Sequence, residues 1–363
     1  MKFRCERDLL VDALNIASKA VTNRGTLPVL HGLRLDLSSN ELVITGSDLD
    51  LTITVSLEVG GEKNGVTVVP AKLLADVVRA VEPGAVDITA EDTNLHVVAG
   101  RSEFSLRTIP KDEYPNFEEP TTSPVTVDGE NLVRALEQVT PAASSDDSRP
   151  ILTGVYMVAE KKGFRLVATD SYRLAVRDMP DASLLEGQPP ILVPSRALTE
   201  LARLIEPNDE VSLHLSDREA SFVVKNVRMT TRLIDGEFPD YQRLVPDSNP
   251  NKLTANRGEL FDAVRRVRLL AQEATPVRLE MSTSGLELIA KTQDIGEAHE
   301  IVDASYSGDE LVIAFNAEYL LKGLEIAPGD EVTLETTDNQ KPAVLKASDH
   351  PEFLYLLMPV RIS

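Results

Sequence analysis

Short runs that alternate between apolar and polar residues occupy most of the chain, and helix-like stretches interrupt them at intervals. Near the start, Leu10, Ala13, Leu14 and Ala17 recur at steps of three and four residues. This spacing predicts a helix with one buried face. Helices of this first kind are expected over residues 7–21, 131–139 and 258–270.

A second helix is predicted about 60 residues after each first one. In "VPAKLLADVVRAV", which begins at Val69, Pro70 suits a helix entrance. The expected buried stripe consists of Leu73, Leu74, Val77, Val78 and Val81. The stretches between the helices read as short strands. "VGGEKNGVTVV" is typical of a hairpin, with Asn64-Gly65 as its turn.

The pattern occurs three times. Strand-like runs end at Asp48, Asp170 and Asp294, at spacings of 122 and 124 residues. Segments of the second helix begin at Val69, Val193 and Phe315, at spacings of 124 and 122. The pairs Tyr114-Pro115 and Phe238-Pro239 also lie 124 residues apart. Solenoid repeats are far shorter, so this period indicates a triplicated domain of about 121 residues.

Two helices and many strands per unit predict an α+β fold, in which helices pack on one face of antiparallel sheets. The sequence thus predicts three tandem copies of one domain. Their expected bounds are residues 1–120, 121–248 and 249–363.

Composition narrows the functional classes. The net charge is −21, which argues against tight binding of nucleic acid but leaves room for a basic stripe on one face. Aromatic residues are 4% and Trp is absent, which disfavours a platform for stacked bases. No apolar run approaches the ~20 residues of a membrane span. Cys5 is the only cysteine, so a reducing cytoplasm is the expected setting.

Basic residues recur on the outward face of the second helix. Lys72 and Arg79 lie seven residues apart, and so do their counterparts Arg196 and Arg203. The third unit has Glu318 and Glu325 at these positions, but its first helix has three arginines, Arg265, Arg266 and Arg268. A solvated helix face explains this as well as a lining for a polyanion, whose phosphates would be contacted without sequence selectivity.

The segment "LVATDSYRLAV" places Asp170, Ser171, Tyr172 and Arg173 within an apolar run. A catalytic group, a structural corner and a rim for a partner are all compatible with it. Asp170 recurs in the repeat, which favours a turn or cap. The neighbours that do not recur are the better functional candidates. The five histidines show no metal-ligand spacing, and no nucleotide or hydrolase motif occurs, so we expect no metal and no cofactor.

The motifs together resemble the beta subunit of bacterial DNA polymerase III, the sliding-clamp family, over the whole chain. The resemblance rests on "MKF", "TLPVLHGL", "RPILTGV", "VATDSYRLAV", "IDGEFPDYQRLVP", "YSGDELVIAFNAEYLL" and "MPVRI". It implies a non-enzymatic ring of two chains, joined head to tail through six similar domains around duplex DNA. The residues implied to face DNA are Arg24, Lys72, Arg79, Arg149, Arg196 and Arg203.

The resemblance also implies a hydrophobic pocket between the second and third domains, which binds short motifs of the polymerase alpha subunit, the clamp-loader delta subunit, repair polymerases and ligase. Its implied lining is Leu152, Thr169, Ser171, Tyr172, Arg173, Leu174, Pro239, Arg243, Leu244, Pro342, Met358, Pro359, Val360 and Arg361. The implied subunit contact joins Phe104 and Leu106 of one chain to Leu269 and Leu270 of the other. Gln242, where relatives often have Arg, and the extra Ser363 depart from the family pattern.

Two alternatives stay open at this point. A hydrolase would use Asp170 with Ser171 or Tyr172, although no histidine is adjacent in sequence. A scaffold would bind peptides without encircling DNA. The family resemblance favours a clamp that acts in the cytoplasm, on the nucleoid.

Overall fold

The computed structural model describes residues 1–22, 27–180, 185–246, 249–271 and 275–361. The first repeat contains β1 (Lys2–Glu6), α1 (Arg7–Ala17), β2 (Gly32–Ser38), β3 (Glu41–Ser47), β4 (Leu51–Glu58), β5 (Gly60–Lys63), β6 (Gly65–Pro70), α2 (Ala71–Ala80), β7 (Ala85–Ala90), β8 (Asn94–Ala99) and β9 (Ser102–Arg107).

The second repeat contains β10 (Val125–Asp128), α3 (Gly129–Val139), β11 (Gly154–Glu160), β12 (Gly163–Thr169), β13 (Arg173–Pro180), β14 (Ile191–Pro194), α4 (Ser195–Leu204), β15 (Glu210–Leu215), β16 (Glu219–Val224) and β17 (Val227–Arg232). The third contains β18 (Asn251–Asn256), α5 (Arg257–Val267), β19 (Val277–Ser282), β20 (Gly285–Thr292), β21 (Gly296–Val302), β22 (Ala304–Ser307), β23 (Leu311–Phe315), α6 (Ala317–Ile326), β24 (Glu331–Thr336), β25 (Ala343–Ala347) and β26 (His350–Leu357).

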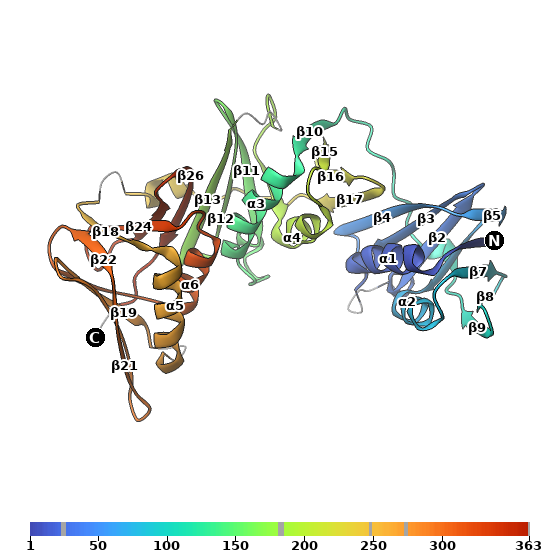
Figure 1. Ribbon diagram of the computed structural model, residues 1–363. Coiled ribbons are helices and arrows are strands. Elements are labelled where there is room, and N and C mark those ends of the chain that lie inside the picture. The colour runs from blue at the N-terminus through green and yellow to red at the C-terminus, as the bar shows by residue number, and fades with distance from the viewer. Residues whose placement is uncertain (23–26, 181–184, 247–248, 272–274, 362–363) are drawn as a thin grey trace. The chain divides into compact units, whose positions relative to one another are not determined.

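The predicted repeat is therefore present. The second helices begin at Ala71, Ser195 and Ala317, which are 124 and 122 residues apart. The first helices agree with prediction, except that α1 and α5 end at Ala17 and Val267 and continue as 3-10 turns. In the first and third repeats the two helices lie side by side on one face of the strands (Figure 1).

Two details of the sequence prediction are wrong. Leu73 is 48% exposed, because the buried face of α2 is formed by Leu74, Val77 and Val78 together with small residues. The expected hairpin around Asn64-Gly65 does not form. β5 pairs with β1 and β6 pairs with β2, so the two strands join different sheets, and the single residue between them is too short for a hairpin loop.

Strand pairing links neighbouring repeats. All strand pairs in the described ranges are antiparallel, and two of them join strands of different repeats: β4 with β17, and β13 with β26. We call these pairs the first junction and the second junction. The first lies inside an eight-stranded sheet, ordered β10-β15-β16-β17-β4-β3-β2-β6, and the second inside a nine-stranded sheet, ordered β14-β11-β12-β13-β26-β25-β24-β18-β22.

The chain accordingly forms two compact units that do not coincide with the repeats. One comprises residues 1–130 and 203–233, and the other comprises residues 131–202 and 234–363. Each unit contains one junction. The halves of the second repeat thus fold with different neighbours, since backbone hydrogen bonds across a junction bind them there.

Gly46 tests how closely α1 packs on β3. A Cβ atom at this position would lie 2.1 Å from the carbonyl oxygen of Ala17, which is far below contact distance. We predict that Gly46→Ala lowers the free energy of unfolding by about 3 kcal/mol, because backbone must move to accept it.

Gly60→Ala is the control, because its Cβ atom would lie 3.4 Å from the nearest atom, the Arg4 oxygen. It should change stability by less than about 1 kcal/mol in the same urea titration. Equal effects of the two substitutions would contradict the packing argument.

Candidate functional site

The turn between β12 and β13 is held by its own side chains. The Asp170 Oδ1 atom accepts hydrogen bonds from the backbone N–H groups of Tyr172 (2.9 Å) and Arg173 (3.0 Å). The Thr169 hydroxyl accepts the N–H of Ser171 at 3.1 Å and donates to the Arg173 carbonyl at 2.6 Å. Ser171 takes a φ of +81°, which these bonds support. Asp170 thus shapes the turn.

The first repeat builds the same turn from different neighbours. Asp48 Oδ1 accepts the N–H groups of Asp50 (3.1 Å) and Leu51 (2.8 Å). Leu49 takes a φ of +78°, close to that of the equivalent Ser171. An aspartate that makes the same bonds in two repeats is architectural.

The third repeat does not share this aspartate, which corrects the expectation for Asp294. The second strands of the equivalent hairpins open at Glu41, Gly163 and Gly285. Seven residues later come Asp48, Asp170 and Thr292. Asp294 instead lies within the turn, with a φ of +63°. Lys291, at the position of Thr169, pairs with Glu297 across five residues, whereas Thr169 pairs with Leu174 across four, so this hairpin has one additional residue. The match in sequence was a coincidence of spacing.

Beside the turn, Arg173 supports an exposed aromatic side chain. Its Nε atom lies 3.0 Å from Asp170 Oδ2, and its guanidinium carbon lies 4.6 Å from the ring centroid of Tyr319 on α6. Tyr172 stacks on Tyr319 with centroids 6.2 Å apart and stays 58% exposed. Burial raises the pKa of Tyr355 to about 12, so its hydroxyl remains a donor to the Tyr319 carbonyl.

The C-terminal segment runs past this aromatic group. Beyond β26, the Met358 N–H donates to the Tyr172 carbonyl at 2.8 Å, and the Val360 N–H donates to the Ala314 carbonyl at 2.8 Å. The side chains of Met358 and Val360 are each 37% exposed. The segment therefore forms one wall of a surface that Tyr172 borders.

An apolar cluster lies on the sheet at the second junction. Val167, Leu174, Val176, Tyr241 and Leu356 are buried together. Partly buried side chains pack against them, namely Tyr156, Phe238, Val245 and Leu354. The 3-10 turn Tyr241–Leu244 ends at Leu244, which is 43% exposed. Exposed apolar side chains over an apolar base are typical of a binding surface.

We call the exposed region around Tyr172, Leu244, Met358 and Val360 the second-junction surface. Most of the predicted pocket residues lie in it or next to it. Arg243 points to solvent and pairs with Asp240 at 2.7 Å. Leu152 is buried at the end of a 3-10 turn, Pro342 precedes β25, and Arg361 is exposed beyond Val360. The sequence did not single out Tyr319, Tyr355 or Val176. Alternation from Leu174 could have indicated Val176, whereas Tyr319 and Tyr355 come from distant segments.

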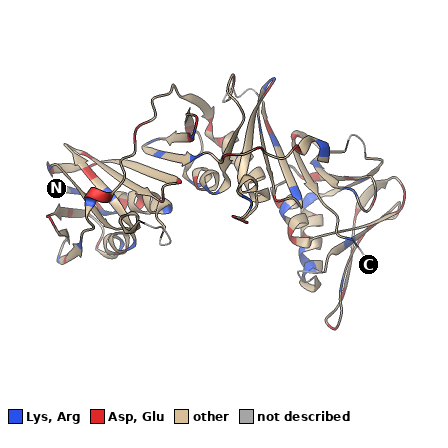
Figure 2. Cartoon of the chain, turned by 180° about the vertical axis from the view of Figure 1, so that it is seen from behind, with Lys and Arg blue, Asp and Glu red and all other residues tan. Residues whose placement is uncertain are grey.

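The predicted DNA-facing residues lie on helices or beside them. Lys72 and Arg79 are exposed on α2, as are Arg196 and Arg203 on α4, and Arg149 is exposed next to Asp146. Arg79 donates to Asn15 Oδ1 at 2.6 Å. Arg24 lies outside the described residues. Figure 2 shows further Lys and Arg on the α5 helix, where Arg265 and Arg266 pair with Asp262 and Glu300.

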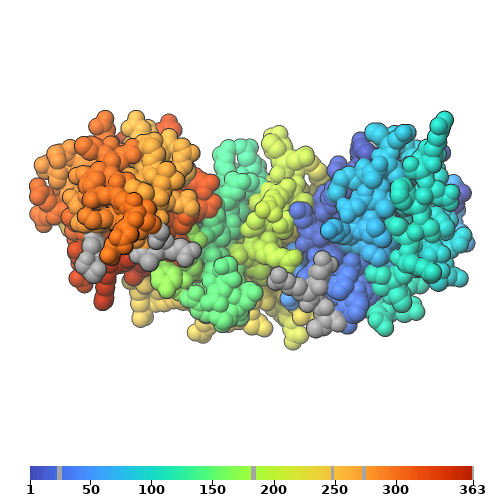
Figure 3. All heavy atoms as spheres, turned by 90° about the horizontal axis from the view of Figure 1, so that it is seen from below, coloured from blue at the N-terminus to red at the C-terminus, as the bar shows by residue number. Residues whose placement is uncertain are grey.

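The predicted subunit-contact residues lie at sheet edges or near them. β9, which carries Phe104 and Leu106, is the last strand of the five-stranded sheet β5-β1-β7-β8-β9. β21 is the last strand of the four-stranded sheet β21-β20-β19-β23, whose β20–β21 hairpin lies at the surface in Figure 3. Leu269, in the 3-10 turn after α5, is 83% exposed, and Ile301 on β21, which the sequence did not indicate, is 80% exposed.

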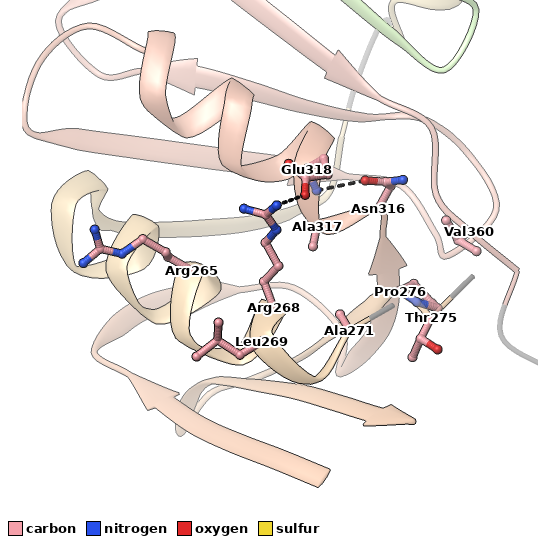
Figure 4. A pocket seen from close by; sticks show the side chains of 10 residues that line it. All are labelled: Arg265, Arg268, Leu269, Ala271, Thr275, Pro276, Asn316, Ala317, Glu318 and Val360. Atoms are coloured by element: carbon pink, nitrogen blue, oxygen red, sulfur yellow. Dashed lines mark hydrogen bonds and ion pairs between the residues drawn. The ribbon is translucent and has the colours of Figure 1, made fainter. Parts of the chain in front are cut away.

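A cavity of about 780 Å³ lies near this edge in the third repeat (Figure 4). Arg268 and Glu318 form an ion pair in it, and Asn316 caps α6 by accepting the N–H of Glu318 at 2.8 Å. Leu269 and Val360 also line it. The cavity therefore joins the C-terminal segment to the region of the sheet edge.

The surroundings of Asp170 do not support a hydrolase mechanism. Its oxygens accept two backbone N–H groups and the Arg173 guanidinium, and in the described part of the chain no hydroxyl or histidine is bonded to it. The described residues also contain no cluster of His, Cys, Asp and Glu suited to a metal. Within the same ranges, no helix is long and apolar enough to cross a membrane.

Comparison with known proteins decides between the remaining possibilities. Family models of the DNA polymerase III beta subunit match the chain in order: the N-terminal domain over residues 1–118, the central domain over 126–240 and the C-terminal domain over 242–361. The chain belongs to the DNA polymerase III beta subunit family. It is a DNA sliding clamp, and the predicted fold of three tandem clamp domains is confirmed.

Curated and solved relatives agree over their full length. The beta sliding clamp of Streptomyces coelicolor is 36% identical, with 100% of each chain covered. The sliding clamp of Bacillus subtilis is 28% identical with a TM-score of 0.95, and that of Bartonella birtlesii, bound to griselimycin, is 32% identical with a TM-score of 0.95; each comparison covers 100% of both chains. Sliding clamps of this family act with DNA polymerase III on DNA.

The role of Asp170 in this clamp can be tested by stability. We predict that Asp170→Ala lowers the free energy of unfolding by about 2–3 kcal/mol, because it removes two backbone caps and leaves Arg173 without its carboxylate. Chemical denaturation monitored by circular dichroism measures the change.

Asp294→Asn serves as the control, since Asn also tolerates a positive φ. It should change stability by less than about 0.5 kcal/mol. A loss as large as that of Asp170→Ala would mean that the two aspartates are equivalent after all.

Proposed function

We propose that two copies of this clamp close into a six-domain ring on the nucleoid, and that the ring encircles duplex DNA without catalysing a reaction. The observation that carries this proposal is that equivalent strands are paired in some repeats and unpaired in others. β4 and β13 each follow their hairpin partner and pair with β17 and β26. The equivalents in the outer repeats, β21 and β9, are sheet edges among the described residues. A third junction would thus form between two chains.

The inner junctions supply a register for the third. At the second junction Ala175 lies opposite Tyr355. Counting along equivalent strands places Ala298 of one copy opposite Phe104 of the other, again a small residue facing an aromatic ring. The same register sets His299 against Glu103, which pairs opposite charges when His299 is protonated. Pairing would also cover the half-buried ring of Phe104, which supports the predicted contact residues.

The charge distribution fits a ring that holds DNA by enclosure. The whole chain has a net charge of −21, so tight electrostatic binding would need a large basic surface. Exposed cations on α2 and α4 instead offer a few phosphate contacts, and several have carboxylate or amide neighbours. Loose contacts of this kind leave the DNA free to move through the ring.

Register is testable with cysteines. We predict that Glu297→Cys combined with Ser105→Cys gives a covalent dimer on oxidation, because these residues face each other in the proposed pairing. Cys5 is buried, and burial raises the pKa of its thiol to about 12, so it will not compete. Non-reducing electrophoresis measures the product.

The matched control is Glu297→Cys with Ser102→Cys, which is three residues out of register. Cross-linking in this control alone, or in neither pair, would refute the proposed contact.

Enclosure predicts a topological binding behaviour. Clamp placed on nicked circular DNA by a clamp-loading ATPase should stay bound through gel filtration in high salt, and should be lost when the circle is cut once. Electrostatic contacts would weaken in salt but would not depend on DNA ends. Equal retention on cut and uncut circles would exclude encirclement.

We further propose that the second-junction surface binds short linear segments of the polymerase alpha subunit, the clamp-loader delta subunit and other partners. Tyr172, Leu244, Met358 and Val360 are exposed around the second junction and offer area to bury, and the junction also contains the apolar cluster. The turn bonds of Asp170 and the stacking of Tyr172 on Tyr319 fix this surface before a partner arrives. Preorganisation of this kind lowers the entropy cost of binding.

Met358 gives the test of this docking site. We predict that Met358→Ala weakens binding of a motif peptide from the alpha subunit about tenfold or more, since burying such a side chain contributes about 1.5–3 kcal/mol. Deletion of residues 360–363 should act in the same direction. Isothermal titration calorimetry measures the affinity.

Leu73→Ala is the control, because Leu73 is an exposed apolar residue on α2. It should leave the affinity unchanged, and both variants should keep the mass of a dimer. Unchanged affinity in Met358→Ala would overturn the assignment.

A further inference from the structure

The first junction carries a cavity of its own. A cavity of about 380 Å³ lies over β4 and β17 in the eight-stranded sheet, entirely within one compact unit. The segment that follows Tyr114 forms one wall. Side chains of β4 and β17 complete its lining, which includes Asp50, Thr54, Glu118, Glu219 and Arg232. We call this cavity the first-junction groove.

The groove occupies the position that the docking surface occupies at the second junction. Thr52 lies opposite Thr230 in the first junction as Leu174 lies opposite Leu356 in the second. The next outward pair is Thr54 with Arg228, equivalent to Val176 with Leu354. The wall residues Pro115 and Phe117 correspond to Pro239 and Tyr241, 124 residues later. The geometry is thus repeated while the side chains differ.

The base of the groove is polar where the second junction is apolar. The hydroxyls of Thr52 and Thr230 are bonded to Ser47 (2.8 Å) and Ser221 (2.9 Å). Thr54 is only 8% exposed and lines the cavity, yet its hydroxyl has no hydrogen-bond partner among the described residues. The Thr54 hydroxyl can therefore donate or accept a hydrogen bond only toward the groove. It favours an occupant that brings a polar group to it.

The charged side chains that line the groove indicate the charge of its occupant. Asp50, Glu118 and Glu219 line the groove, and none of them forms an ion pair in the described part of the chain. Arg228 is neutralised by Glu119 at 2.9 Å, which leaves Arg232 as the opposing cation. Three carboxylates against one guanidinium give the lining a negative balance. Lysine or arginine side chains would complement it.

We propose that the first-junction groove is a second docking site, which binds an extended segment of a partner protein rich in Lys or Arg and in small polar residues. This proposal goes beyond the docking proposed above, because an equivalent position in the fold would bind a polar, basic segment here and an apolar segment at the second junction. Apolar motifs are excluded here, since they would leave the Thr54 hydroxyl and the carboxylates desolvated without partners. One chain would thereby hold two partner segments of different composition at once.

A fluorescent peptide of alternating Lys and Ser residues is the probe, and the dimeric full-length protein is the receptor. We expect saturable binding of one peptide per chain by fluorescence anisotropy. Glu219→Lys and Thr54→Leu should each weaken it about fivefold or more, the first by like charge and the second by filling the groove. A peptide of alternating Glu and Ser should not bind.

Glu41→Lys is the matched control, since it makes the same charge change on the neighbouring strand β3, at the end away from the groove, where Glu41 lies opposite Glu58. Met358→Ala is the second control, because it affects only the second-junction surface. Both should leave the affinity for the Lys–Ser peptide unchanged. Absence of binding, equal loss in Glu41→Lys, or loss in Met358→Ala would overturn the proposal, and the last result would assign the peptide to the other junction.

Discussion

Backbone pairing between repeats is the constraint on which the structure depends. A single repeat would leave both of its junction strands unpaired on one side, and an unpaired edge exposes N–H and C=O groups that can bind another strand. The β4–β17 and β13–β26 pairs satisfy four of these edges within the chain. They also explain why the compact units cut across the repeats, since the halves of the second repeat belong to different sheets. Strand pairing therefore joins the three similar repeats of the clamp into continuous sheets.

Repetition of the backbone leaves the side chains at each junction free to differ. The turn aspartates Asp48 and Asp170 make the same bonds, so both junctions begin from the same corner. Beyond this corner, threonines and charged residues line the first junction, whereas leucine, valine and tyrosine line the second. The two junctions therefore present different side chains on a common backbone. If both bind partners as proposed, their selectivity differs without any change in the fold.

The sequence predicted the repeat, the helices and the fold class, because apolar periodicity is a local property that strand pairing does not alter. It did not predict which strands pair, since the β5–β6 segment looks like a hairpin and joins two sheets instead. Asp294 shows the same limit, because a one-residue change in a turn is invisible to spacing alone. The proposed docking surface was implied by the family motifs. Its support from Tyr319 and Tyr355 was missed, because those residues lie more than 140 positions from Tyr172 and meet it only in the fold.

The open edges β9 and β21 also bear on how the chain behaves before it finds its partner. A newly made copy exposes both of these edge strands, which could extend the sheet of an unrelated protein and so invite aggregation. Glu103 and Arg107 on β9, and Glu297, His299 and Glu300 on β21, interrupt both edges with charge. Charged edge residues discourage casual pairing, yet a correctly matched strand can satisfy them. The same residues that make the edge selective would thus keep the unassembled chain in solution.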